Sequence, residues 1–493
     1  MTAESSDVPV GVAVGNTGDG LWSAVLFPAD EPGIAVGDLV ATESAKRRIV
    51  SVVLRRRFLT NSASLEAYVA SRISRRGVEA VPDLRGEVAV FPVIDARPIS
   101  IVDASGDEIP VTWGADVAPL SVVHRASATD EEKTFGLRPV DGTGLSLGSL
   151  WGTGSPAMVS MAEFFSHVAV VGTTGAGKTR FVAAIIAQLA QREDASIVVI
   201  DPLGEYAALL DALGVSALVE SRFPGTKRGI GLAPSDFSAS LVQCSLPRNL
   251  DDSIAAAMMH SFSLLESRYR HQASADQSAA DVARRYEAEI EMLAKATSSS
   301  AALTAGGQNL RHQFSQPTAL ELWRLVFRDL GAGRPLTELI AQRKPVVLLD
   351  TKALDHRAES IYAVGVIAGL IKARRADRIK RRIIIVLEEA HRFVAPDSPV
   401  FAAIVQAVRE ARKVQLSLVL VSQRMGDFSP VVLGNTGAVA AFRLPDREDI
   451  DYLARRSPSF ASLLEGVTSL ETSAGYFFAS RRRVPIGFRT TPY

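Results

Sequence analysis

The fold of this chain is decided by Gly172-Thr173-Thr174-Gly175-Ala176-Gly177-Lys178-Thr179. This stretch matches the pattern G-x-x-x-x-G-K-[ST], follows the apolar run 167–171 and precedes a helical pattern over 181–190. Glycines let such a loop curl so that successive backbone N–H groups face phosphate oxygens, and the following helix adds the positive end of its dipole. The sequence therefore predicts a phosphate-binding loop over residues 172–180, ending with Arg180.

Two side chains of this loop have predicted roles in nucleotide chemistry. Lys178 is expected to neutralise charge on the β- and γ-phosphates, and Thr179 is expected to bring its hydroxyl to a magnesium ion. The expected ligands are therefore ATP and Mg²⁺.

A second group of candidate residues follows the hydrophobic run 383–387, which ends in Glu388 and Glu389. Ligands of open α/β folds bind at the carboxyl edge of the sheet, so acids at a strand end lie where a nucleotide would bind. Successive side chains diverge at a strand end, and the two acids can therefore do different work. We predict that Glu388 contacts the water shell of Mg²⁺ and that Glu389 polarises the attacking water.

Other strand and helix ends complete the predicted site. Asp201 and Gln423 follow apolar runs, and the carboxamide of Gln423 can donate to a phosphate and accept from water, as a nucleotide sensor would. Arg409 and Arg412 lie near the end of a predicted helix over 401–413. One of them could stabilise the transferring phosphoryl group of a neighbouring subunit. Alternatively, they only complement the helix dipole.

From about residue 161 to 493, short apolar runs alternate with helical patterns, which is typical of an α/β fold with a parallel sheet. Five runs are apolar on both faces, as strands of a buried parallel sheet are. They cover residues 167–171, 197–200, 346–349, 383–387 and 416–421. A helical insertion is expected at about 248–340.

The first 112 residues contain short apolar runs bounded by turn residues, which predicts a small β-barrel domain. Residues 113–160 are rich in Gly, Ser, Asp and Pro and are expected to form a linker with irregular strands. Basic runs at 46–48 and 55–57 lie in the β domain. They indicate either a solvated or subunit-facing surface, or a basic face near the mouth of a DNA channel.

Composition restricts the class of protein without naming a partner. The 493 residues contain 54 basic and 54 acidic side chains, so global charge points to no nucleic acid or membrane. One cysteine, Cys244, excludes an intramolecular disulfide. No apolar run approaches the ~20 residues of a spanning helix, and we expect a cytoplasmic protein without membrane contact.

The order of these motifs resembles the HerA branch of the HerA/FtsK ring ATPases. The resemblance rests on the loop 172–179, the motif 201–206 (Asp-Pro-Leu-Gly-Glu-Tyr), the motif 388–391 (Glu-Glu-Ala-His), residues 412–413 and residues 422–424. It implies a RecA-like core behind a HAS-barrel, a homo-hexamer that threads double-stranded DNA, and a NurA-like nuclease or another effector as partner, in DNA end processing or antiviral defence. It also implies that the C-terminal tail, about 480–493, braces the adjacent subunit.

Two functions remain open at this point. The first is an ATP-driven translocase or helicase on duplex DNA. The second is an assembly ATPase, whose ring scaffolds and licenses a partner enzyme with little unwinding of its own. Both functions use the same nucleotide site, so the motifs do not separate them.

Overall fold

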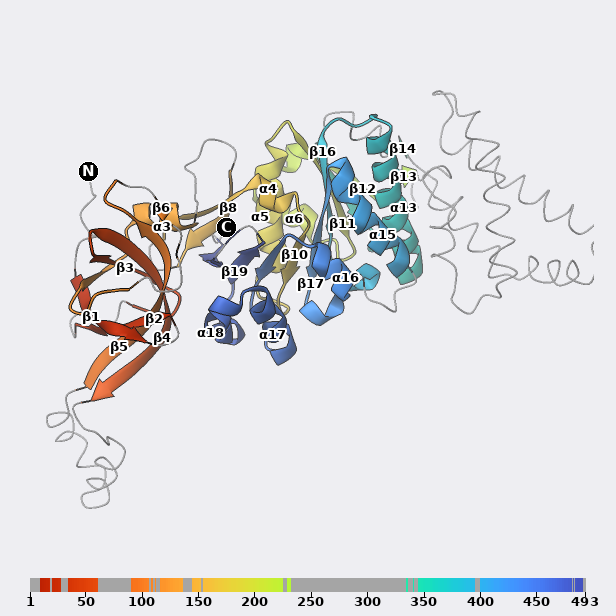
Figure 1. Ribbon diagram of the computed structural model, residues 1–493. Helices are drawn as coiled ribbons and strands as arrows, with labels where there is room; N and C mark the ends of the chain where they lie inside the picture. Colours follow the sequence, from red (N-terminus) through yellow and green to blue (C-terminus); the bar gives the residue numbers. More distant parts are fainter. Residues whose placement is uncertain are drawn as a thin grey trace, which may run out of the picture.

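The computed structural model describes sixteen stretches of the chain. They are residues 9–17, 20–27, 34–60, 90–105, 108–109, 111, 116–135, 144–151, 154–224, 228–231, 334–335, 340, 345–394, 400–480, 482 and 484–490. The predicted helical insertion, 248–340, lies almost wholly outside the described residues, as does Cys244. The described residues form two units, an N-terminal barrel and a larger α/β core (Figure 1).

The α/β core is built on an eleven-stranded sheet in the order β12-β15-β11-β16-β17-β10-β18-β19-β20-β8-β9. All five predicted strands are confirmed within it: β10 (Val168–Val171), β11 (Ala195–Asp201), β15 (Val346–Asp350), β16 (Arg382–Leu387) and β17 (Leu416–Ser422). These strands pair in parallel, and their apolar side chains are almost fully buried on both faces. Helices cover both faces, which explains why the runs are continuous rather than alternating.

One face of the sheet packs on α5 (Lys178–Ala190) and α6 (Tyr206–Ala212). The opposite face packs on α13 (His356–Arg375), α15 (Phe401–Ala411) and α17 (Arg447–Arg456). Along the parallel strands, alternate residues enter the two cores: Val168 and Val170 face α5, whereas Ala169 and Val171 face the other layer. Each fully buried Val, Leu or Ile side chain contributes about 1.5–3 kcal/mol, so this layering supplies much of the stability of the core.

Beyond β10 the sheet continues with one parallel strand, β18, and then with antiparallel strands. β18 (Ala438–Ala441) pairs in parallel with β10, and then β19 (Ala474–Ala479), β20 (Ile486–Arg489), β8 (Gly144–Leu150) and β9 (Pro156–Ser160) follow in antiparallel pairs. The predicted tail, 480–493, thus contributes β20 to the sheet of its own chain, because Ile486 and Phe488 are fully buried there.

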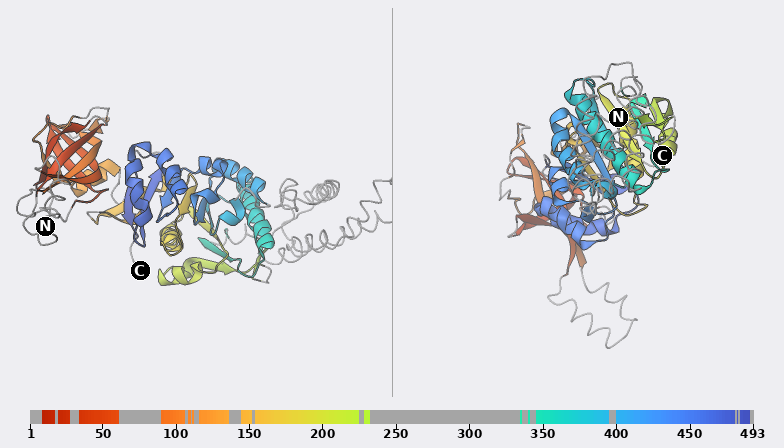
Figure 2. Two further views of the ribbon diagram at one scale, coloured as in Figure 1. Left: turned by 90° about the horizontal axis from the view of Figure 1, so that it is seen from below. Right: turned by 90° about the vertical axis from the view of Figure 1, so that its right-hand side faces the viewer.

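The N-terminal unit is a closed antiparallel barrel. Its six strands are β1 (Pro9–Thr17), β2 (Leu21–Leu26), β3 (Leu39–Ser44), β4 (Arg47–Thr60), β5 (Val90–Val102) and β7 (Val122–Arg125), and the pairing of β2 with β5 closes the ring. Trp22 is fully buried inside and donates its indole N–H to the Ser51 hydroxyl at 2.9 Å. Figure 2 shows the barrel at one end of the α/β core. This confirms the predicted β-barrel.

Two arginines of the basic runs serve the barrel itself. Arg48 forms a bidentate ion pair with Asp130, with both N–O distances 2.7 Å, and Arg57 pairs with Asp95 at 3.1 Å. Asp130 lies on α3 (Ala128–Phe135), which follows the last barrel strand. The Arg48 pair joins the barrel wall to α3, whereas the Arg57 pair joins two strands of the wall, β4 and β5.

The segment 113–160, expected to be a linker with irregular strands, is divided between the two units. It contributes β7 to the barrel, then α3, and then β8 and β9 to the large sheet. Its glycines mark irregular places within regular strands: Gly148 in β8 has φ 129°, and a Cβ there would lie 2.0 Å from the Arg489 carbonyl oxygen. Among the residues of this segment that the structure describes, Gly148 therefore permits a close contact between strands.

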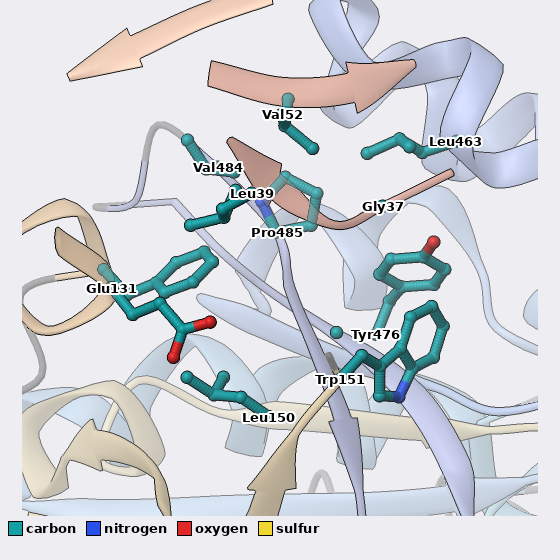
Figure 3. A pocket seen from close by; sticks show the side chains of 12 residues that line it. Gly37, Leu39, Val52, Glu131, Leu150, Trp151, Leu463, Tyr476, Val484 and Pro485 are labelled. Carbon is teal, nitrogen blue, oxygen red and sulfur yellow. The ribbon is translucent and has the colours of Figure 1, made fainter. Parts of the chain in front are cut away.

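A small pocket marks the joint between the two units (Figure 3). Barrel residues Gly37 and Val52 line one side, and Leu463, Trp151 and Tyr476 of the core line the other. The Trp151 and Tyr476 rings pack with centroids 4.7 Å apart. The barrel therefore rests on aromatic side chains of the antiparallel part of the sheet.

His167 ties three elements of the core together directly before β10. Its Nδ1 accepts the Leu418 N–H of β17 at 2.9 Å, and its Nε2 donates to the Val408 carbonyl of α15 at 3.1 Å. The ring is 1% exposed, and this burial is the main cause that lowers the pKa of His167 to about 4. The neutral ring thus fixes α15 relative to the strand that leads into the phosphate loop.

We expect the stability of the core to fall as pH drops from about 6.5 to about 4, because unfolded histidine takes up a proton in this window whereas folded His167 does not. His167 contributes up to about 3 kcal/mol to this loss. The variant His167→Ala should be less stable at neutral pH, since two buried backbone groups lose their partner, and should show a flatter pH dependence in urea unfolding. An unchanged pH slope would contradict the assignment.

Candidate nucleotide-binding site

The phosphate loop, residues 172–179, has the backbone that only glycine tolerates at its ends. Gly172 has φ 153° and Gly177 has φ 106°. A Cβ on Gly172 would lie 2.7 Å from the Phe442 Cβ, whereas a Cβ on Gly175, with φ 76°, would meet no atom within 4 Å. The loop is therefore packed tightly at its start against Phe442, the residue after β18, and is open at its centre.

The segments that follow β18 and precede β19 hold the loop in this shape. The Thr173 N–H donates to the Arg443 carbonyl at 2.9 Å, and the Ser473 N–H donates to the Ala176 carbonyl at 2.9 Å. Within the loop, the Lys178 ammonium donates to the Thr173 carbonyl at 3.1 Å. Helix α5 begins at Lys178, so its amino-terminal N–H groups and Thr179 follow directly. This arrangement presents the positive end of a helix at the loop, as anion binding requires.

Three carboxylates act on the buried Lys178. Burial lowers its pKa, and the negative charges of Glu388, Glu389 and Glu205 oppose that shift. Glu388 and Glu389 follow β16, and Glu205 precedes α6. The predicted acids and the predicted lysine thus come together at one edge of the sheet.

Glu388 is a buried acid with a defined partner. Its side chain sits in a residue only 3% exposed, and its Oε2 accepts a hydrogen bond from the Tyr206 hydroxyl at 2.5 Å. Burial raises the pKa of Glu388 to about 7, the charge of Glu389 adds to the rise, and the Tyr206 hydrogen bond and Lys178 oppose it. Glu388 is therefore an acid whose charge is only partly compensated by the protein.

Glu389 has a different environment from its neighbour. Its backbone is left-handed, with φ 50°, and its Oε2 lies 3.1 Å from the His391 Nδ1. The contact with His391 is the main cause that lowers the pKa of Glu389, and the neighbouring Gln423 and Lys178 lower it further. Glu389 also raises the pKa of His391. This acid is therefore ionised and paired with His391 in the segment after β16, as a group that orients water would be.

Asp201 is the last residue of β11 and has three backbone hydrogen-bond partners. Its carboxylate is fully buried and accepts the N–H groups of Leu203, Gly204 and Tyr206 at 3.2, 2.8 and 3.0 Å. Asp201 thus organises the turn after β11, and a direct contact with nucleotide stays a prediction. Sequence reasoning assigned no role to Tyr206 or His391, although both belong to the motifs that it singled out.

The remaining predicted residues lie at the surface. Thr174, Gly175, Arg180 and Gln423 are exposed or nearly so around the loop. Arg409 is exposed in the last turn of α15, Arg412 is exposed directly after that helix, and their roles stay predictions.

The residues present fit a magnesium ion. Mg²⁺ takes hard oxygen ligands, commonly one or two protein oxygens with phosphate and water. Thr179 at the start of α5 offers a hydroxyl, and the buried Glu388 offers a carboxylate whose negative charge lacks full compensation. Among the described residues there is no cluster of three or more His, Cys, Asp or Glu side chains that would form a separate metal cage.

We expect Gly172→Ala to destabilise the core more than Gly175→Ala. Both changes place a side chain on a left-handed backbone, at a cost of about 1–2 kcal/mol. Only the Gly172 methyl overlaps the buried Phe442, which adds an overpacking cost of about 1–3 kcal/mol. Urea unfolding of the two variants without nucleotide measures the difference, and equal losses would rule out the tight packing at β18.

Comparisons with known proteins agree with this geometry. Residues 145–367 match the family described as "Helicase HerA, central domain". No curated protein sequence matches the chain. Among solved structures, VirB4 of Thermoanaerobacter pseudethanolicus has a TM-score of 0.53 at 16% identity, covering 72% of this chain and 97% of VirB4.

The plasmid coupling protein TrwB is similar as well. In complex with the GTP analogue GDPNP it has a TM-score of 0.53 at 11% identity, covering 74% of this chain and 93% of TrwB. In complex with ADP and Mg²⁺ the TM-score is 0.50 at 14% identity, covering 75% and 93%. At such identities the likeness shows the fold alone. Residues 145–367 are thus similar to the HerA central domain, and the core of the chain has the α/β fold shared with VirB4 and TrwB.

Proposed function

We propose that this chain hydrolyses ATP at a subunit interface of a ring and uses the energy to move double-stranded DNA. One observation carries the hydrolytic part: Lys178, Glu388 and Glu389 interact electrostatically at the carboxyl edge of three adjacent strands, β10, β17 and β16. Ligands of open α/β sheets bind at this edge. The TrwB complex with ADP and Mg²⁺ supports the same ligands for this fold.

Different residues of the chain would bind the phosphates, hold Mg²⁺ and orient the attacking water. The phosphate loop would bind the β- and γ-phosphates through backbone N–H groups and the Lys178 ammonium, which must release the Thr173 carbonyl to do so. Thr179 and Glu388 would hold Mg²⁺, which neutralises charge that develops on the phosphates. Glu389, kept ionised by His391, would orient the attacking water, and Gln423 beside it would sense the γ-phosphate.

Ring assembly and DNA belong to the proposal through the HerA resemblance. A homo-hexamer would place the exposed Arg409 and Arg412 of one subunit toward the nucleotide of the next. A NurA-like nuclease or another effector enzyme would act on the DNA that the ring moves. None of the helices described in this structure is long and apolar enough to span a membrane.

We expect Glu389→Gln to lower ATP turnover by about 10²–10⁴-fold while ATP is still bound, because the amide cannot polarise water as the carboxylate does. Lys178→Ala should lose binding itself. Turnover and the affinity for a fluorescent ATP analogue are measured with and without duplex DNA, with the exposed Glu193→Gln as control. Normal turnover by Glu389→Gln would overturn the assignment.

The same assay separates a DNA translocase from an assembly ATPase that licenses a partner enzyme. Duplex DNA should stimulate turnover of the isolated chain, and size measurement should show a ring near six subunits. Turnover that depends on a bound partner enzyme and ignores DNA would instead identify an assembly ATPase.

We expect Arg412→Ala to lower turnover by about 10³-fold or more while leaving ATP affinity nearly intact, because a guanidinium supplied in trans acts on the transition state. Arg409→Ala, on the same helix end, is the matched comparison. Mixing Arg412→Ala subunits with Glu389→Gln subunits should restore turnover at the interfaces that combine an intact acid with an intact arginine. No recovery in any mixture would argue against action across the interface.

A further inference from the structure

The segment after β11 has a structure that the proposed reaction does not yet use. Its sequence is Asp201-Pro202-Leu203-Gly204-Glu205-Tyr206, and it leads from the strand edge into α6. Both ends of the segment are fully buried: Asp201 and Tyr206 are each 0% exposed. We propose that this segment positions Glu388, with Tyr206 as the contacting residue and Asp201 as its support. The inference rests on the proposed function, because Glu388 is taken as the magnesium residue.

Asp201 shapes the turn from within. One carboxylate oxygen accepts the Leu203 and Gly204 N–H groups, and the other accepts the Tyr206 N–H at 3.0 Å. Gly204 has φ 73°, so the turn needs a residue that tolerates the left-handed region. A buried carboxylate that satisfies three N–H groups fixes the backbone of Tyr206 at the start of α6.

Tyr206 in turn restrains the side chain of Glu388. Its hydroxyl donates to Glu388 Oε2 at 2.5 Å. Its ring belongs to the hydrophobic cluster formed by α5 and the face of the sheet that packs on α5. A ring packed in this way has little freedom to follow a moving carboxylate. The hydrogen bond therefore occupies one oxygen of Glu388 and leaves the other for the metal shell.

The two adjacent acids then have separate supports. Glu388 is held by Tyr206 from the β11 side, whereas Glu389 pairs with His391 of its own segment at 3.1 Å. Loss of the Tyr206 hydroxyl should thus disturb the metal-binding acid and leave the water-orienting acid in place. Such a change should raise the Mg²⁺ concentration that nucleotide binding requires.

The experiment compares Tyr206→Phe with Tyr362→Phe in the full-length protein. Tyr362 is also 0% exposed and lies on α13, outside the nucleotide site, so it controls for the loss of a buried hydroxyl. Affinity for a non-hydrolysable ATP analogue is measured against Mg²⁺ concentration and again in EDTA, and kcat and KM are measured at saturating Mg²⁺.

We expect Tyr206→Phe to raise the Mg²⁺ concentration at half-saturation by about 10-fold, the effect of losing a hydrogen bond to a charged group. Affinity in EDTA should be unchanged, and kcat should fall more than KM rises. Tyr362→Phe should match wild type in each measurement. If Tyr206→Phe does not fold, Asp201→Asn provides the same test through the turn, with a smaller expected shift in the same direction.

Two outcomes separate the positioning role of Tyr206 from the proposed ATPase function. A Tyr206→Phe protein with lower thermal stability but wild-type Mg²⁺ demand would reduce Tyr206 to a packing residue and overturn the inference while the proposed function stands. A wild-type protein whose affinity for the analogue ignores Mg²⁺ would remove the proposed function and this inference together.

Discussion

The parallel register among β10, β17, β16 and β11 is the constraint on which the candidate site depends. Val171 pairs with Ser422, Leu420 with Leu387, and Leu387 with Ile200. These pairs bring four strand ends to one edge, so that residues more than two hundred positions apart in sequence meet there. A slip of one residue in any pair would turn the adjoining side chains to the opposite face. The buried apolar faces of the strands exclude such a slip, and the chemistry of the site therefore depends on ordinary hydrophobic packing.

Much of this core could be predicted from the sequence, because its signals are local. The phosphate loop is a contiguous pattern between a strand and a helix, and five strands are short apolar runs with clear ends. The acids at 388 and 389 could be placed at the sheet edge for the same reason. The barrel was also predictable as a class, since turn residues separate its short strands, although closure through β2 and β5 joins residues about seventy positions apart.

Other features depend on contacts that no local pattern encodes. The bond between Tyr206 and Glu388 spans 182 positions, and His167 reaches Val408 across 241. Asp201 illustrates the difficulty: a carboxylate at a strand tip fits a ligand contact and a turn cap equally well, and the three backbone N–H groups that it accepts come from residues that no sequence pattern ties to it. The strands β8 and β9 were hidden by glycine and serine, which here permit close backbone approach.

The two neighbours of β10 in the sheet have a consequence for the unit of folding. β17 and β18 both come after residue 411, whereas the stretch that matches the HerA central domain ends at residue 367, within α13. A fragment cut at that boundary would keep the glycine-rich loop but leave both edges of its strand without hydrogen-bond partners. The recognisable segment is thus not an autonomous module, because the strands on both sides of β10 come from the carboxyl-terminal quarter of the chain.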